Sequence, residues 1–172
     1  MPIDKNESFT GLILVSGQDR PGITQSLMST LSEFAVNILD IEQLVIRDRL
    51  LLTVLITLDE AHAEAIASDL DLLQEKLQLD IAIDFVQTNI NEDASDNLRV
   101  VIVGSEIKPV GLSAVASEIA RLGGNITAIK RTARNPVIAI EMNLTIPNDS
   151  IKIVQEALKK YFIGSEFIDE EI

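Results

Sequence analysis

The stretch GQDRPGI, residues 17–23, holds residues whose types and order suit a small charged ligand. It lies between the apolar run TGLILVS and the periodic run ITQSLMSTLSEF, so a strand is expected to turn into a helix there. The first N–H groups of a helix lack partners within the helix and attract a carboxylate or a phosphate. Because Gly22 has no side chain, a ligand atom can approach its backbone closely.

Asp19 and Pro21 allow a simpler interpretation, in which the stretch is only a helix cap. Asp19 can accept from the first free N–H groups, and Pro21 suits the first helical position because it lacks an N–H. In the other interpretation, loop amides hold a carboxylate while Asp19 or Asn37 holds an ammonium group. We expect Asn37 near the loop because it begins the next strand. The two interpretations are a turn and an amino-acid pocket.

Hydrophobic periodicity predicts the elements that position this stretch. The first half of the chain gives the order β-α-β-β-α-β, with strands at 9–16, 37–46, 50–58 and about 81–85 and helices at 23–34 and 60–77. The polar run NINEDASDN then breaks the pattern and predicts a linker. After it the same order returns, with a turn at 134–136 and a last strand at 165–172.

The two halves form an internal repeat. Gly22 and Gly111 lie 89 residues apart, and Asn37 and Asn125 lie 88 apart. The predicted fold class is α+β, with two ferredoxin-like βαββαβ domains in tandem at 1–90 and 98–172, joined by residues 91–97. Each domain has a four-stranded antiparallel sheet with helices on one face. The other face and an edge strand need a cover, so we expect a dimer.

Composition excludes several classes of function. The net charge of −13, without a basic block, argues against direct binding to nucleic acid or to an acidic membrane surface. The absence of cysteine excludes disulfides and thiol catalysis, and the N-terminus has no signal-peptide pattern, so we expect a cytoplasmic protein. One histidine, His62, makes a metal site unlikely to form, and we expect none.

No catalytic machinery is recognisable in the chain. SDLDLLQ, residues 68–74, carries two aspartates one residue apart, but it lies within a periodic helix and is interpreted as helix surface. Ser113 follows Gly111 closely but has no base nearby in the sequence. We therefore expect a binding module.

GQDRPGI with the following NILDIEQ resembles an ACT domain, a small ligand-binding module attached to enzymes of amino-acid metabolism. DRPGITQSL with NILDIEQLVIRDRLLLTVLI, and PVGLSAVA with GGNITAIKR, resemble the N-terminal region of actinobacterial-type phosphoserine phosphatases. In that family, two ACT domains precede a haloacid-dehalogenase-type domain with a DxDxT motif and Mg²⁺. This chain has no such motif, so the resemblance implies no cofactor here and Mg²⁺ only in a phosphatase domain outside the chain.

The resemblance implies binding of an amino acid, with L-serine favoured, between one domain's loop and a neighbouring ACT domain of a homo-oligomer. The candidate ligand-binding residues are Gln18, Asp19, Arg20, Pro21, Gly22, Ile23, Asn37, Gly111, Leu112 and Asn125. The second copy departs from the pattern, because its loop SEIKPVG is longer and has Lys108 near the place of Arg20. It is expected to serve as a lid for the first site or as a structural partner. The alternative is a stand-alone tandem ACT regulator that acts through a protein partner, similar to the glycine-cleavage regulators.

Overall fold

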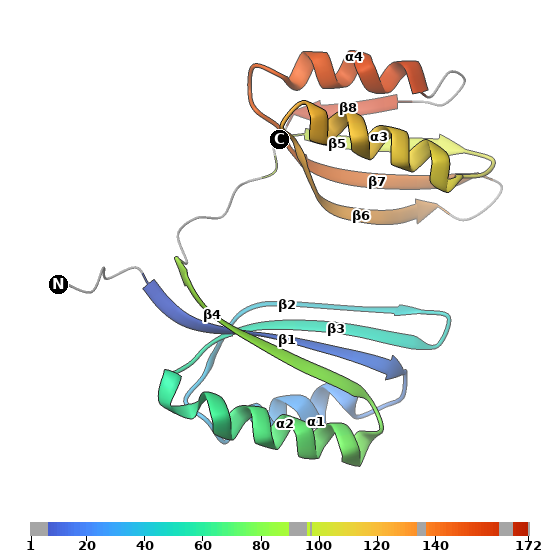
Figure 1. The fold of residues 1–172 in the computed structure, drawn as a ribbon. Coiled ribbons are helices and arrows are strands. Elements are labelled where there is room, and N and C mark those ends of the chain that lie inside the picture. The colour runs from blue at the N-terminus through green and yellow to red at the C-terminus, as the bar shows by residue number, and fades with distance from the viewer. Residues whose placement is uncertain (1–6, 90–95, 97, 134–136, 162–166, 172) are drawn as a thin grey trace. The chain divides into compact units, whose positions relative to one another are not determined.

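The structure is a computed structural model, and it describes residues 7–89, 96, 98–133, 137–161 and 167–171 (Figure 1). The chain divides into two compact units, Met1–Glu92 and Asp93–Ile172, here called unit 1 and unit 2. The predicted linker, residues 91–97, lies outside the described residues except for Asp96, and the predicted turn at 134–136 lies wholly outside them.

Unit 1 has the predicted order β-α-β-β-α-β. Its elements are β1 (Glu7–Gln18), α1 (Ile23–Leu31), β2 (Asn37–Ile46), β3 (Arg49–Thr57), the short 3₁₀ turn η1 (Glu60–His62), α2 (Ala63–Leu77) and β4 (Asp80–Asn89). The strands form one antiparallel sheet in the order β2-β3-β1-β4. Both helices cover one face of this sheet and leave the other face open within the unit (Figure 1).

Unit 2 repeats the arrangement. Its elements are β5 (Leu98–Gly104), α3 (Pro109–Arg121), β6 (Asn125–Ala133), β7 (Ile138–Thr145), α4 (Ile151–Tyr161) and β8 (Phe167–Glu171). The sheet order is β6-β7-β5-β8, and α3 and α4 lie on one of its faces (Figure 1). The predicted fold of two ferredoxin-like domains is confirmed.

Strand registers show how closely the two units correspond. Asn37 pairs with Thr57 in unit 1, and Asn125 pairs with Thr145 in unit 2. Both edge strands also shift register one step further on, between Ile38 and Asp40 and between Ile126 and Ala128. A β-bulge at the same position of both units supports the repeat, because bulges are specific features of a strand.

The core of unit 1 forms between the buried side chains of the sheet and the apolar faces of its two helices. Leu52, Val54 and Ile56 of β3 are fully buried and face Ile23, Leu27 and Leu31 of α1 and a similar stripe of α2. Truncation of such a residue to alanine costs about 2–5 kcal/mol. This core fixes α1 on the sheet, and with it the loop that precedes α1.

The two edges of the unit 1 sheet differ. On β4, the side chain Oε1 of Gln74 accepts a hydrogen bond from the N–H of Ile81 at 2.8 Å. On β2, every residue is exposed, including Ile41, Leu44, Val45 and Ile46. An apolar strand edge of this kind can pair with another chain.

Candidate functional site

The loop that joins β1 to α1 is fastened to the neighbouring hairpin. The N–H of Asp19 donates to the carbonyl of Asp48 at 2.8 Å. Arg47 and Asp48 both have positive φ values, of 45° and 65°, so β2 and β3 are joined by a two-residue turn. The loop therefore leaves the sheet from a defined point, beside the tip of the β2–β3 hairpin.

The residue at the N-cap position of α1 is Gly22, not the predicted Asp19. Gly22 is the N-cap residue with φ 94°, and no side chain caps the helix. The prediction that Asp19 caps the helix is therefore wrong, and Pro21, predicted near the first helical position, lies two residues before Ile23, where the helix starts. The positive φ explains this, because only glycine adopts it readily and the chain cannot enter the helix before it.

The missing cap leaves donors available. The first hydrogen bond of the helix runs from the N–H of Ser26 to the carbonyl of Gly22 at 2.9 Å. The N–H groups of Ile23, Thr24 and Gln25 have no acceptor among the described residues. Free N–H groups at a helix start favour an anionic group.

These donors face an open hollow of about 350 Å³, here called the loop hollow. Its lining residues are Asp19, Arg20, Pro21, Gly22, Ile23, Thr24, Gln25, Gln43 and Leu50. A Cβ atom added to Gly22 would meet nothing within 4 Å, so the backbone there is open to a ligand. Five predicted residues, 19–23, therefore line one hollow, whereas Gln18 ends β1 beside Arg49 and does not line it.

Gln43 and Thr24 line the loop hollow but were not predicted. The hydroxyl of Thr24 donates to Oε1 of Gln43 at 2.7 Å, which joins the first turn of α1 to β2. One signal was present in the sequence. Gln43 alternates with Ile41 and Val45, so it interrupts an otherwise apolar face of the strand.

Arg20 has a structural partner. Its guanidinium Nη2 donates to the carbonyl of Leu77, the last residue of α2. A cation at a helix C-terminus satisfies a free carbonyl and interacts favourably with the helix dipole. Arg20 therefore joins the loop to α2 while it lines the loop hollow.

Asn37 does not lie near the loop of its own unit, so that expectation is wrong. It pairs with Thr57, which also pairs with Thr10, whereas the loop follows Gln18 at the opposite end of β1. Gln18 follows Thr10 by eight steps along the strand, which is about 26 Å. The physical reason is that α1 runs back along the sheet, so β2 begins at the far end.

Unit 2 builds the corresponding loop differently. Its helix α3 has Lys108 as N-cap residue and Pro109 in its first turn, so Gly111 lies inside the helix. The N–H of Gly111 already donates to the carbonyl of Lys108 at 3.0 Å, and Lys108 forms an ion pair with Glu106 at 3.0 Å.

The other predicted residues of unit 2 are also apart from this loop. Leu112 packs half-buried against the core, and Asn125 begins β6, which pairs with Thr145 at the far end of the sheet. Within unit 2, the candidates Gly111 and Asn125 are therefore not brought together.

Comparison with known proteins gives the family. Models of the ACT domain match residues 10–84 and residues 97–166. The chain belongs to the ACT-domain family. Unit 1 is the first ACT domain and unit 2 is the second.

Two curated relatives are phosphoserine phosphatases. The chain is 34% identical over 160 residues to phosphoserine phosphatase SerB2 of Mycobacterium tuberculosis, covering 87% of this chain and 37% of that protein. It is 33% identical over 140 residues to phosphoserine phosphatase of Streptomyces coelicolor, covering 77% of this chain and 32% of that protein. The chain thus spans about a third of the length of these relatives.

A solved structure resembles the whole tandem arrangement. A protein described as a glycine cleavage system transcriptional repressor superposes with a TM-score of 0.73 at 14% identity, covering 96% of this chain and 99% of that one. At this identity the likeness shows the fold. The fold of both units is therefore shared with that protein.

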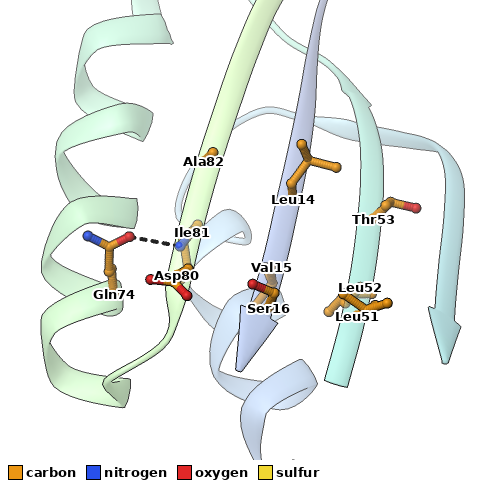
Figure 2. A pocket seen from close by; sticks show the side chains of 10 residues that line it. All are labelled: Leu14, Val15, Ser16, Leu51, Leu52, Thr53, Gln74, Asp80, Ile81 and Ala82. Atoms are coloured by element: carbon orange, nitrogen blue, oxygen red, sulfur yellow. Dashed lines mark hydrogen bonds between the residues drawn. The ribbon is translucent and has the colours of Figure 1, made fainter. Parts of the chain in front are cut away.

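The first ACT domain has a second hollow of about 340 Å³, here called the sheet hollow (Figure 2). It is lined by Leu14, Val15, Ser16, Leu51, Leu52, Thr53, Gln74, Asp80, Ile81 and Ala82. Leu14 and Leu51 are each more than two-fifths exposed, on the sheet face that the helices leave open. The sheet hollow is mainly apolar, so it suits packing against another surface better than it suits binding of a zwitterion.

The remaining sequence features lie where they were predicted. Asp69 and Asp71 of SDLDLLQ lie within α2, and His62 is exposed. Among the described residues, no group of three His, Cys, Asp or Glu side chains could hold a metal ion. No helix in the described ranges is both long enough and apolar enough to span a membrane.

Proposed function

We propose that this chain is an amino-acid-binding regulatory part of a phosphoserine phosphatase, and that its ligand is L-serine. Hydrolysis of phosphoserine, and the Mg²⁺ for that reaction, would belong to a catalytic domain outside this chain. The module would act in cytoplasmic serine biosynthesis. The relatives at 33–34% identity support the link to the phosphatase.

The observation that carries the proposal is the loop hollow. The first residues of α1, whose N–H groups are uncapped, line it together with the exposed Asp19. An α-amino acid carries a carboxylate and an ammonium group a short distance apart. The N–H groups would bind the carboxylate and Asp19 would bind the ammonium group.

Assembly would complete the site. The exposed apolar β2 is free to pair with β2 of a second copy in antiparallel fashion. Such pairing brings the start of one copy's β2, and with it Asn37, to the loop end of the other copy. The Asn37 amide could then donate to and accept from a ligand held by the second copy's loop.

Regulation follows from this arrangement if the ligand contacts both copies. L-Serine would then bind more tightly to one assembly state than to another and shift the population toward it. The size of the shift is limited by the difference in affinity between the two states.

The direct test is a thermal-shift and calorimetric titration with L-serine, beside glycine, L-threonine, D-serine and phosphoserine. A ligand that binds only the folded state adds about 2.7 kcal/mol of stability at 100 times its dissociation constant. We expect stabilisation by L-serine and a change in sedimentation on its addition. Absence of both effects with every amino acid would reject the proposal.

The second candidate is a stand-alone tandem ACT regulator that acts through a protein partner. The likeness in fold to a glycine cleavage system transcriptional repressor over both full chains favours it. Two observations separate the candidates. Selectivity for glycine over L-serine favours the second, and a coding sequence that continues past Ile172 into a strand followed by DxDxT favours the first.

A further inference from the structure

Gln43 is an exposed polar residue between two apolar neighbours on one side of β2. It pairs with the fully buried Leu52, so its side chain is on the helix-facing side of the sheet. Its neighbours on that side of β2 are Ile41 and Val45. The Gln43 amide therefore interrupts the apolar side of this strand.

The side-chain amide of Gln43 is held in one orientation. Its Oε1 accepts from the hydroxyl of Thr24 at 2.7 Å, and Thr24 lies in the first turn of α1. This leaves both N–H donors of Nε2 available, and no described residue accepts from them. Because Gln43 lines the loop hollow, these donors add to its wall of N–H groups.

The second ACT domain shows that the fold does not require this pair. The register places Arg131 opposite Ile140, as it places Gln43 opposite Leu52, so Arg131 is the equivalent of Gln43. Ser113 is the equivalent of Thr24, because each lies two residues after the repeated glycine. The same edge-strand position thus carries a cation in one domain and a neutral donor in the other. Glutamine at this position is therefore particular to the first domain, where it lines the loop hollow.

We propose that Gln43 is a specificity-determining residue of the loop hollow, whose amide N–H donates to the carboxylate of the bound amino acid. Thr24 is its positioning residue. This inference rests on the proposed function and names the chemistry that selects the ligand. A neutral donor suits a group with a single negative charge on a ligand that is zwitterionic overall.

The charges around the loop hollow support this selectivity. Among the described lining residues Arg20 is the one cation, and Asp19 adds a negative charge of the same size. The charge of Arg20 is already balanced by Asp19, so the extra negative charge of phosphoserine would have no further cation to balance it. The hollow should therefore bind L-serine in preference to phosphoserine.

The test is calorimetric titration of the full chain with L-serine, with L-serinamide, which lacks the carboxylate, and with phosphoserine. Gln43→Glu keeps the size of the side chain but replaces its donors with a negative charge. It should weaken L-serine binding by at least about tenfold, since a hydrogen bond to a charged group has this value. Gln87→Glu, at an exposed position of β4, is the control with the same chemical change.

Thr24→Val is the second variant, because it frees the Gln43 amide without adding charge. We expect a smaller loss, about threefold to tenfold, confined to ligands with a carboxylate. The weak affinity for L-serinamide, which is a cation, should not fall in any variant. Melting curves establish that each variant is folded before it is titrated.

The outcomes separate this inference from the proposed function. If the unaltered chain binds L-serine and Gln43→Glu binds it equally well, the role of Gln43 is overturned and the proposed function stands. If the unaltered chain binds no amino acid, both are overturned. Equal losses for L-serine and L-serinamide would indicate a merely structural role, which also overturns the inference.

Discussion

The two ACT domains share a fold but build their first loop in different ways. In the first domain, Gly22 with its positive φ starts α1 without a cap and leaves N–H groups on an open hollow. In the second, the loop between strand and helix has the same length, against the expectation of a longer one, but the helix begins before Gly111, and the N–H of Gly111 is already bonded to Lys108. The comparison teaches that a repeated glycine does not imply a repeated site.

The edge strands differ in the same sense. From Glu42 to Val45 the first domain has Glu-Gln-Leu-Val, whereas the corresponding strand of the second has Lys-Arg-Thr-Ala at residues 130–133. Charged and polar residues on an edge discourage pairing with another chain, and apolar residues permit it. The first domain therefore has both the more open hollow and the edge better suited to assembly.

The largest effect is expected from charges on the β2 edge. Ile41→Lys with Leu44→Lys should raise the dissociation constant of self-association by at least about tenfold, because both apolar side chains would be buried in a paired edge. The measurement is sedimentation over a range of concentrations. Ile129→Lys is the matched control, at the same register position of β6 and 57% exposed. Equal effects of the two changes would remove the distinction between the edges.

The glycine pair provides a second test of the comparison. Gly22→Val should lower the stability of the first domain by about 1–2 kcal/mol through its positive φ, and the added side chain should abolish amino-acid binding. Gly111→Ala should stabilise the second domain by about 0.5–1 kcal/mol, because Gly111 is helical and an added Cβ meets nothing within 4 Å. Amide hydrogen exchange of α1 and α3 and calorimetric titration measure these effects.

A particular result would change the interpretation of Gly111. If Gly111→Ala leaves α3 intact but abolishes binding, the second domain contributes directly to an amino-acid site. The candidate residues Gly111, Leu112 and Asn125 would then belong to a site that needs a neighbouring domain.

The smallest effect is expected at the anchor of the loop. Arg20→Gln removes the cation from the carbonyl of Leu77, at an exposed position, and should lower the stability of the first domain by less than about 1 kcal/mol. Faster amide exchange in the last turn of α2 and in the loop would be the readout. Lys76→Gln makes the same charge change in that turn and is the control. If both variants behave alike, charge alone explains the effect and the hydrogen bond contributes little.

Much of the fold could be predicted from local patterns. Period-two alternation located Ile81, Ile83 and Phe85, and the helical stripe located Ile66, Leu70 and Leu73, because burial of one face imposes these spacings. The nearly equal spacings of Gly22 to Gly111 and of Asn37 to Asn125 indicated the repeat. The ends of elements were less accurate, since α1 stops at Leu31 and the last turn before β2 is not helical.

The candidate site was only partly predictable. The loop residues 19–23 are neighbours in sequence, so they necessarily lie together. The start of α1 at Ile23 was predicted, but its cap was misassigned, because Asp19, Pro21 and Gly22 are all helix-start signals and the conformation of Gly22 decides between them. Asn37 was misplaced because its position depends on the direction of α1 along the sheet.

The sequence by itself determined the order of elements, the repeat, the apolar faces and the loop that can hold a charged ligand. Those features depend on the types of neighbouring residues and their period. Only the tertiary structure decided that Gln43 and Thr24 line the loop hollow, that Arg20 anchors α2, and that Asn37 lies at the far end of its own sheet. These placements result from strand register and helix packing. The residues that they join are separated in the sequence by 19 positions for Thr24 and Gln43 and by 57 for Arg20 and Leu77, so no local pattern indicates them.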